Sequence, residues 1–402
     1  MTERLSLRQL NRALLQRQGL LERSSGSALE TIDHLVGMQS QAPLAPYVGL
    51  WSRLSSFTPD ELVDLMNSRE VVRIVLMRGT IHLVKADDAL AIRPLVAEVM
   101  QRGLAANKPA AAAAAAVPSL LEVAERLLSS TPMNPSQLAA ALEAEFPGHD
   151  AALLSRAVRD LLPCVQVPPR GLWRKAGQPT LTPTTTWLGR TPPPQTPPRP
   201  SSSPSTPSPP APSPSPSSLT SSSLLAPAPL TIDDLVLRYL TAFGPASVLD
   251  AQAWSGLTRL GEVFDRLRPQ LRTYLSPEGR ELFDLASISL PDEDTPVDVR
   301  FIAEFDNLLL SHADRTRIIR DEHRREIITI NGIVRGTILV DGFVTAWWKA
   351  TLTRPTATLH ITPLPNTPPL PHPATNTAAT TLLNFLAPQT PTHTITFHPQ
   401  AT

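Results

Sequence analysis

The feature that most constrains this chain is a stretch of proline and serine near its middle. Residues 191 to 220 contain 13 Pro and 9 Ser, and Arg199 is their only charged residue. Such a stretch has too few apolar side chains to bury a core, and its prolines favour an extended polyproline conformation. We therefore predict a disordered linker over residues 191–228, with separately packed regions on either side of it in the 402-residue chain.

The region before the linker starts with helices and a short hairpin. Apolar residues recur there at helical spacing, and two β-rich runs flank Arg78-Gly79, which is typical of two strands joined by a tight turn. The predicted helices are 5–19, 43–55, 58–67 and 86–103, and the predicted strands are 71–77 and 80–84. Helices followed by a two-stranded ribbon are the pattern of a winged helix.

The same pattern recurs twice along the chain. An alanine run at 110–116 is expected to be an exposed connector. After it we predict helices at 120–129, 135–145 and 150–161, a strand from Cys164, a turn at Arg170-Gly171 and a return strand from Leu172. Beyond the linker we predict helices at 232–243, 247–255 and 257–268, and a hairpin centred on 277–279. Three copies of one plan predict three tandem winged helices.

From residue 300 the pattern changes to short β-rich runs. The predicted strands are 300–305, 326–330, 337–340, 344–348, 357–361 and 394–397, with a helix at 380–386. The predicted fold class is therefore α+β, with three tandem winged-helix domains and a C-terminal antiparallel β domain. The predicted divisions are a first winged helix at 1–106, an Ala-rich connector at 107–116, a second winged helix at 117–190, the linker at 191–228, a third winged helix at 229–295 and the β domain with a docked helix at 296–402.

Composition and missing motifs exclude several classes of function. Cys164 is the single cysteine, which rules out an internal disulfide or a thiolate zinc site, and the chain has no Gly-rich phosphate loop, GxSxG, HExxH or CxxC motif. We expect no metal and no organic cofactor. The 36 basic and 36 acidic residues balance, so a globally basic protein is excluded, although a basic channel is not. No apolar run is long enough to span a membrane, and we expect a cytoplasmic protein.

Two glutamines form the most informative local group. Pro43 disfavours helix for Ala42, so the residues before it should be extended, and Gln39 and Gln41 should then face the same way at the entrance to a helix. From spacing alone, the alternative is a polar loop between two helices.

The residue identities in this region are more specific than the spacing of the two glutamines. The run at 35–43 (LVGMQSQAP), followed by 47–53 (YVGLWSR), resembles the QxQ region of the AlkZ/YcaQ-type winged-helix DNA glycosylases. Further phrases resemble that family in the same order, namely RGTIHLV at 78–84, WLGR at 187–190, RYLTAFGPA at 238–246, DNLLLSH at 306–312 and VDG at 340–342.

The resemblance implies both a fold and an activity. Three winged helices and a β domain would form a concave DNA-binding channel, with Gln39 and Gln41 at its catalytic centre. The family cleaves the N-glycosidic bond of N-alkylated purines, including bulky adducts and interstrand crosslinks, and glutamine at both positions is the pattern of its AlkZ-like branch. Ser40 departs from the apolar residue that the family usually carries there. We expect its side chain to point away from the reacting water and Ser40→Ala to be nearly silent.

Four further residues are candidates for DNA binding. Arg78 and His82 on the first hairpin are placed to contact phosphate or the lesion, although a solvated arginine and a packed histidine are the alternatives. Arg315 and Arg317 belong to the densest basic stretch, where nearby acids favour a solvated, salt-bridged surface and phosphate contact is the second interpretation. The expected partner is double-stranded DNA carrying alkylated purines, bound by a monomer.

Two other functions remain open from the sequence. Winged helices also serve transcriptional regulators, so a non-catalytic DNA-binding protein is the main alternative. The third hypothesis is an interaction protein that works through the proline- and serine-rich linker.

Overall fold

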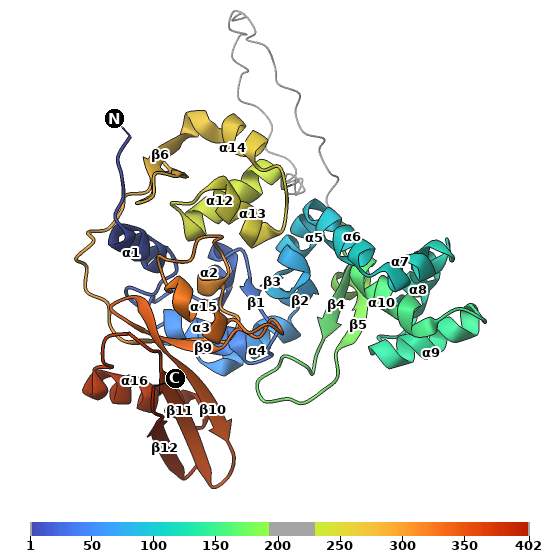
Figure 1. Ribbon diagram of the computed structural model, residues 1–402. Helices are drawn as coiled ribbons and strands as arrows, with labels where there is room; N and C mark the ends of the chain where they lie inside the picture. The colour runs from blue at the N-terminus through green and yellow to red at the C-terminus, as the bar shows by residue number, and fades with distance from the viewer. Residues whose placement is uncertain (1, 193–229, 401–402) are drawn as a thin grey trace, which may run out of the picture.

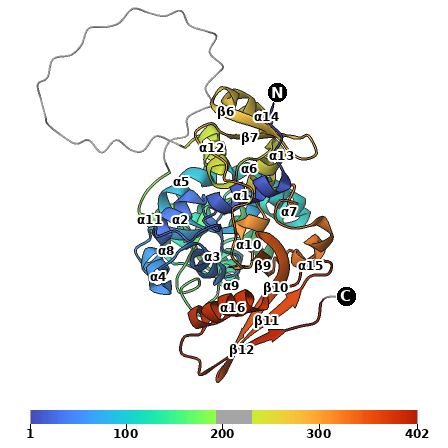
Figure 2. The same ribbon diagram turned by 90° about the vertical axis from the view of Figure 1, so that its left-hand side faces the viewer.

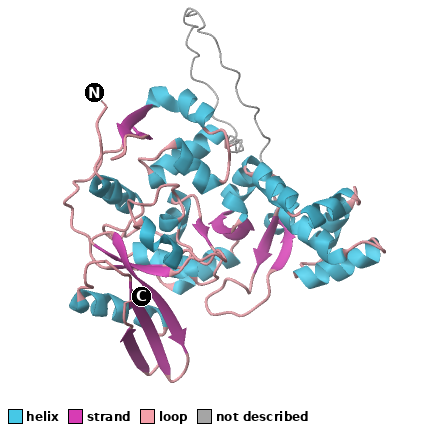
Figure 3. Cartoon of the chain, in the orientation of Figure 1, coloured by secondary structure: helices cyan, strands magenta, loops and turns pink. Residues whose placement is uncertain are grey.

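The computed structural model describes residues 2–192 and 230–400, and residues 193–228 of the predicted linker lie outside this range (Figure 1). Helices and strands alternate in groups along the chain, which confirms the α+β class (Figure 3). None of the helices in the described part of the chain has the length and apolar character of a membrane span.

The first group contains four helices and a hairpin. They are α1 (Leu7–Arg17), α2 (Ala28–His34), α3 (Ala45–Arg53), α4 (Pro59–Asn67), β2 (Val71–Val75) and β3 (Ile81–Lys85). The hairpin is confirmed, with residues 77–79 forming a short 3-10 turn between its strands. Helix α2 was not predicted, although Ser27 and Glu30 form a capping box at its start. The helix predicted at 86–103 is two helices, α5 (Ala86–Leu95) and α6 (Ala97–Ala106).

The second group departs from its prediction in two places. It contains α7 (Lys108–Ala115), α8 (Leu120–Ser130), α9 (Pro135–Glu145), α10 (Ala151–Leu161), β4 (Cys164–Val167), β5 (Thr180–Pro183) and α11 (Thr184–Leu188). The alanine run is helix α7 rather than an exposed connector, because alanine favours helix and Ala110 is fully buried in this group's core. Leu172 does not start the return strand, which begins at Thr180 after a loop.

One sheet joins the first two groups. Its strand order is β1-β3-β2-β4-β5, where β1 is Met38–Gln39, and every pairing in it is antiparallel. The pairing of Arg73 with Gln166 links the two hairpins that the sequence predicts as separate wings. The domain boundary at 107–116 therefore remains a prediction.

The third group matches its prediction closely. It contains α12 (Ile232–Phe243), α13 (Val248–Ser255), α14 (Gly261–Leu267), the 3-10 turn Arg268–Gln270, β6 (Leu271–Leu275) and β7 (Glu281–Leu285). Most of its buried aromatic side chains join the largest hydrophobic core, which also contains residues of the first hairpin and of the C-terminal part.

The C-terminal group is a sheet with one helix against it (Figure 2). Its strands lie in the order β12-β11-β10-β9-β8, where β8 is Arg300–Ile302, β9 is Gly336–Val340, β10 is Phe343–Leu352, β11 is Thr356–Pro363 and β12 is Thr392–Phe397. Strand β12 runs parallel to β11, so the purely antiparallel prediction is wrong at this edge. Helix α16 (His372–Leu386) lies between the two strands in the chain, and a helical crossover returns the next strand in the same direction.

The segment between β8 and β9 is irregular. It contains the 3-10 turns Asn307–Leu309 and Asp321–His323, followed by the short helix α15 (Arg324–Ile327). The strand predicted at 326–330 is wrong, because Ile327 is fully buried at the end of α15 and only Ile328 makes a β-bridge. Tertiary packing overrides β propensity here.

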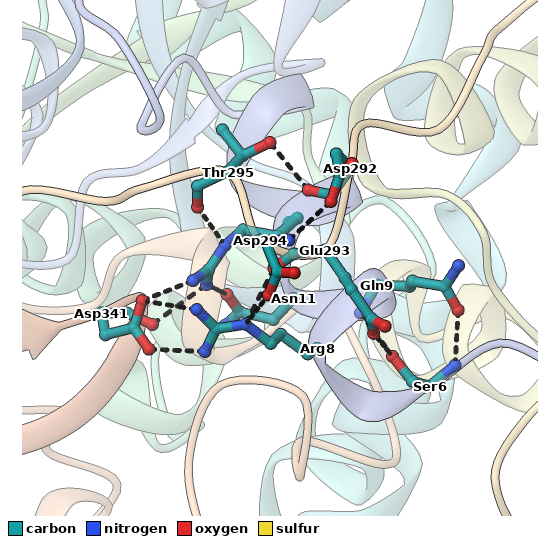
Figure 4. A network of polar contacts seen from close by, with 10 residues as sticks. Ser6, Arg8, Gln9, Asn11, Asp292, Glu293, Asp294, Thr295 and Asp341 are labelled. Carbon is teal, nitrogen blue, oxygen red and sulfur yellow. Dashed lines mark hydrogen bonds and ion pairs between the residues drawn. The ribbon is translucent and has the colours of Figure 1, made fainter.

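Helix α1 is tied to the C-terminal sheet by a polar network (Figure 4). Arg8 and Arg12 both donate to the carboxylate of Asp341 in the β9–β10 turn, and Asn11 donates to the Gly342 carbonyl at 2.8 Å. A Cβ at position 342, where φ is +83°, would lie 2.3 Å from Asn11 Oδ1. Glycine is therefore required where α1 meets this turn.

A buried ion pair joins α3 to the segment after β8. Arg53 donates to both carboxylate oxygens of Asp306 at 2.8 Å, and both side chains are 2% exposed. Arg53 also donates to the Gly49 carbonyl and to Gln18 Oε1. The pair links residues 253 positions apart in the chain.

We predict that Asp306→Ala lowers the free energy of unfolding by about 3–5 kcal/mol, because it leaves the Arg53 guanidinium buried without its counter-charge. Chemical denaturation measures this. The double variant Arg53→Met/Asp306→Leu should recover much of the loss, because it buries no charge. An Asp306→Ala protein as stable as the wild type would contradict the role given to this pair.

Candidate active site

The backbone at residues 37–39 brings the QxQ segment onto the first hairpin. Gly37 has φ +91°, and a Cβ there would lie 2.3 Å from Val84 Cγ1, so only glycine fits this close approach. Met38 and Gln39 then form β1, in which Gln39 pairs with His82. The extended conformation predicted before Pro43 is present at Met38 and Gln39, whereas Gln41 and Ala42 lie in a bend and α3 begins at Ala45 rather than at Pro43.

Gln39 is buried and oriented by an arginine. Its Oε1 accepts a hydrogen bond of 2.7 Å from Arg78 Nη2, while Arg78 Nη1 donates to the Trp254 carbonyl on α13. Arginine is only a donor, so this contact fixes which end of the Gln39 amide is oxygen. The second lone pair of Oε1 and the amide NH₂ have no protein partner among the described residues. Arg78 itself has φ +57° at the tip of the hairpin.

Gln41 and Ser40 have different surroundings. Gln41 is exposed, and its Oε1 accepts a weak contact of 3.4 Å from the Ile81 backbone N–H. Ser40 is fully buried, and its hydroxyl and carbonyl oxygens each accept a hydrogen bond of 2.9 Å from Arg73. The Ser40 side chain thus faces Arg73, whereas the Gln39 side chain faces Arg78.

The buried Arg73 depends on neutral acceptors. Besides Ser40, its guanidinium contacts the Arg170 carbonyl at 3.3 Å, and no carboxylate among the described residues lies within ion-pair distance of it. Burial, followed by repulsion from Arg170, lowers the pKa of Arg73 to about 10. The guanidinium is still charged at neutral pH. The expectation that Ser40→Ala is nearly silent therefore conflicts with the structure, because the hydroxyl helps to satisfy this cation.

His82 is packed rather than presented to DNA. Its side chain is fully buried, and its Nδ1 lies 3.0 Å from the Thr80 carbonyl. Burial, followed by repulsion from Arg78, lowers the pKa of His82 to about 3, so the ring is neutral at physiological pH. These observations favour the packed alternative over a phosphate contact.

The two candidate arginines near residue 316 have different roles. Arg317 is 4% exposed and donates to the Pro245 carbonyl at 2.7 Å, so it is a buried structural residue. Both interpretations drawn from the sequence place Arg317 at the surface, and both fail because it is buried against the segment between α12 and α13. Arg315 is half-buried and donates to the His312 carbonyl at 3.2 Å.

Arg315 is one of three arginines whose positive charges act on one another, beginning with Arg78 beside Gln39. Burial lowers the pKa of Arg78 to about 10 with a further contribution from Arg315, and burial lowers the pKa of Arg315 to about 10 with a further contribution from Arg324. None of the three has a carboxylate within 4 Å among the described residues. We call Arg78, Arg315 and Arg324 the arginine row. Nearby acids pair elsewhere, since Asp314 contacts Arg280 at 3.2 Å.

A small cavity lies beside Gln39. Its volume is about 10 Å³, and it is lined by Leu35, Met38, Gln39, Ala45, Arg53, Ala303, Glu304, Asp306 and Asn307. That volume is close to what one water needs. Asn307 donates to the Gly37 carbonyl at 3.0 Å, whereas its buried Oδ1 has no partner among the described residues. Burial raises the pKa of Glu304.

Glu304 and Asn307 were not predicted as site residues. Asn307 stands in the DNLLLSH phrase, but nothing local in the sequence shows that this phrase packs against β1. Within residues 2–192 and 230–400, no group of three or more His, Cys, Asp or Glu side chains is arranged to hold a metal.

Comparison with known proteins identifies proteins that are similar to this chain. The model of the AlkZ-like DNA glycosylase family matches residues 32–385. The solved structure of the Streptomyces sahachiroi DNA glycosylase AlkZ aligns with a TM-score of 0.72 at 18% sequence identity, covering 98% of this chain and 100% of that one. No curated protein sequence matches the chain.

We predict that Ser40→Ala lowers the free energy of unfolding by about 1–3 kcal/mol, because a buried guanidinium N–H loses its acceptor. Ser119→Ala is the control, since Ser119 is exposed and makes no capping hydrogen bond at the start of α8. In an Arg73→Met background, Ser40→Ala should cost less. A Ser40→Ala protein that denatures at the same urea concentration as Ser119→Ala would refute this role of the hydroxyl.

Proposed function

The chain belongs to the family of AlkZ-like DNA glycosylases, and from this premise we propose that it is a monofunctional glycosylase for N-alkylated purines in DNA. The observation that carries the proposal is the buried Gln39, held by Arg78 at the edge of a cavity that fits one water. The residues that line this cavity include no lysine, which favours water over an amine as the nucleophile.

The chemistry suits a pair of glutamines. An N7- or N3-alkylated purine already carries a positive charge, so no general acid has to protonate the leaving base. The site must hold a water near C1′ and tolerate an oxocarbenium-like transition state. Arg78 orients the Gln39 amide and leaves a lone pair and the NH₂ group for water, while the Gln41 side chain is exposed to solvent.

The proposed substrate is double-stranded DNA, bound in a channel along the arginine row. Arg315 and Arg324 have no carboxylate partner among the described residues, so their charges are available to phosphates although the chain has no net charge. A single lesion needs no paired half-sites, so we propose that the protein acts as a monomer in the cytoplasm.

The proposal extends to bulky adducts and interstrand crosslinks. The cavity beside Gln39 holds about one water, which is far less than the volume of a purine. A site that does not enclose the base sets little steric limit on the size of its alkyl group. A non-catalytic DNA-binding protein is the alternative that the following experiment distinguishes.

We predict that Gln39→Ala or Gln41→Ala lowers the single-turnover rate of N7-methylguanine excision by about 10² or more, comparable to the loss of one preorganised catalytic contact. DNA affinity should change little. Gln16→Ala on α1 is the control, because Gln16 is exposed and lies outside the site. Melting temperatures measured alongside separate a catalytic loss from unfolding. Full activity in both variants would refute the proposed mechanism.

We predict that Arg315→Ala and Arg324→Ala each weaken binding to duplex DNA of any sequence. Each substitution should reduce the slope of log affinity against log salt concentration by about 1, because one phosphate contact is lost. Arg126→Ala on α8 is the control, since Arg126 is exposed and pairs with Glu145. Salt slopes that match the control in both variants would argue against a channel along the arginine row.

A further inference from the structure

A carboxylate lies next to the QxQ segment without an assigned role. Glu304 follows β8 and lines the cavity beside Gln39. It also lines a second hollow of about 170 Å³, which is bounded by Ala42, Leu44, Val48, Trp348 and Leu352 among others. Glu304 therefore sits between Gln39 on one side and the residue after Gln41 on the other.

The surroundings of Glu304 differ from those of its neighbour Asp306. Both oxygens of Asp306 are held by Arg53, and Oδ1 also accepts from the Leu308 N–H. Glu304 has no hydrogen bond and no ion pair with any described residue, and it is exposed to solvent. The cavity thus has one carboxylate that is locked in structure and one that is free to react.

The charged groups around Glu304 are few. Lys349 of β10 shares the second hollow, and its charge lowers the pKa of Glu304 by less than burial raises it. Arg53 and Asp306 share the first cavity, where they neutralise each other. No other titratable side chain lines either hollow among the described residues.

The proposed reaction lacks a group that accepts a proton. Glutamine amides orient water, but they are not bases at neutral pH. We propose that Glu304 is a further catalytic residue, the general base that accepts the proton of the attacking water and whose negative charge stabilises the oxocarbenium-like transition state. This inference rests on the glycosylase function proposed above.

The step balances without any co-reactant. The water oxygen forms a bond to C1′ while the bond between C1′ and N9 breaks. The electron pair of the broken bond stays on N9 and neutralises the cationic alkylpurine. One proton moves from the water to the Glu304 carboxylate, which later releases it to solvent. The products are a neutral free base and an abasic deoxyribose.

A catalytic role and a purely structural role of Glu304 predict different effects of Glu304→Gln on stability. Because the folded-state pKa of Glu304 is raised, the folded protein binds this proton more tightly than the unfolded chain, and stability falls as pH rises through that range. A neutral glutamine at this position should therefore keep or raise the melting temperature at neutral pH. A carboxylate that held the structure together would instead lower it when replaced.

The test compares excision of N7-methylguanine by the wild type, Glu304→Gln and Glu304→Asp over a range of pH. Glu143→Gln is the matched control, because Glu143 is an exposed glutamate on α9 outside the site. Glu304→Gln should excise about 10² to 10⁴ times more slowly, with DNA affinity and melting temperature at neutral pH no lower than in the control. Glu304→Asp should recover part of the rate. The wild-type rate should rise with pH to a plateau, and this rise should be absent from Glu304→Gln.

Three outcomes would overturn the inference. They are a wild-type rate in Glu304→Gln, the same pH profile in both proteins, and a rate loss that a fall in melting temperature explains. If the wild type and Glu304→Gln excise N7-methylguanine equally well, the role proposed for Glu304 is wrong and the proposed function stands. If the wild type releases no base from any alkylated DNA, the proposed function fails as well.

Discussion

The arrangement of the site depends on the buried pair of Arg53 and Asp306. Taking two charges out of water costs several kcal/mol for each ion, and the cost is offset here by two hydrogen bonds of 2.8 Å and by the further acceptors of Arg53. The pair holds the segment after β8 against α3 and β1, and so forms one wall of the cavity beside Gln39.

The site is assembled from segments far apart in the sequence. Gln39 lies on β1, Arg78 at the tip of the first hairpin, Trp254 on α13 and Glu304 after β8. Arg78 connects three of these parts, because it bonds Gln39 and the Trp254 carbonyl while its charge adjoins that of Arg315. A charged side chain that orients a neutral amide therefore also begins the proposed path for the DNA backbone.

Local sequence patterns predicted the elements of the site but not their contacts. Pro43 predicts an extended segment before a helix, which is present at Met38 and Gln39, and the hairpin around Arg78-Gly79 follows from its β-rich flanks. The burial of Arg317 and the exposure of Glu304 depend on which distant segments pack against them, and periodicity contains no information on that.

The lack of information on distant contacts also explains the wrong expectation for Ser40→Ala. Read alone, Ser40 looks like a polar substitute in an apolar position, whereas its partner Arg73 lies 33 residues away on β2. The parallel edge of the C-terminal sheet depends on the crossover that α16 makes between β11 and β12, and β-rich runs alone do not give the direction of a strand. The wrong predictions thus concern contacts between residues or strands that are far apart in the sequence.

The most direct test of the account is to identify the product released from duplex DNA that carries N7-methylguanine. The account predicts free N7-methylguanine in solution, detected by mass spectrometry, and a DNA strand that stays intact until alkali cleaves it at the abasic site. Tight binding without release of base, or strand cleavage by the protein itself before alkali is added, would contradict a monofunctional glycosylase.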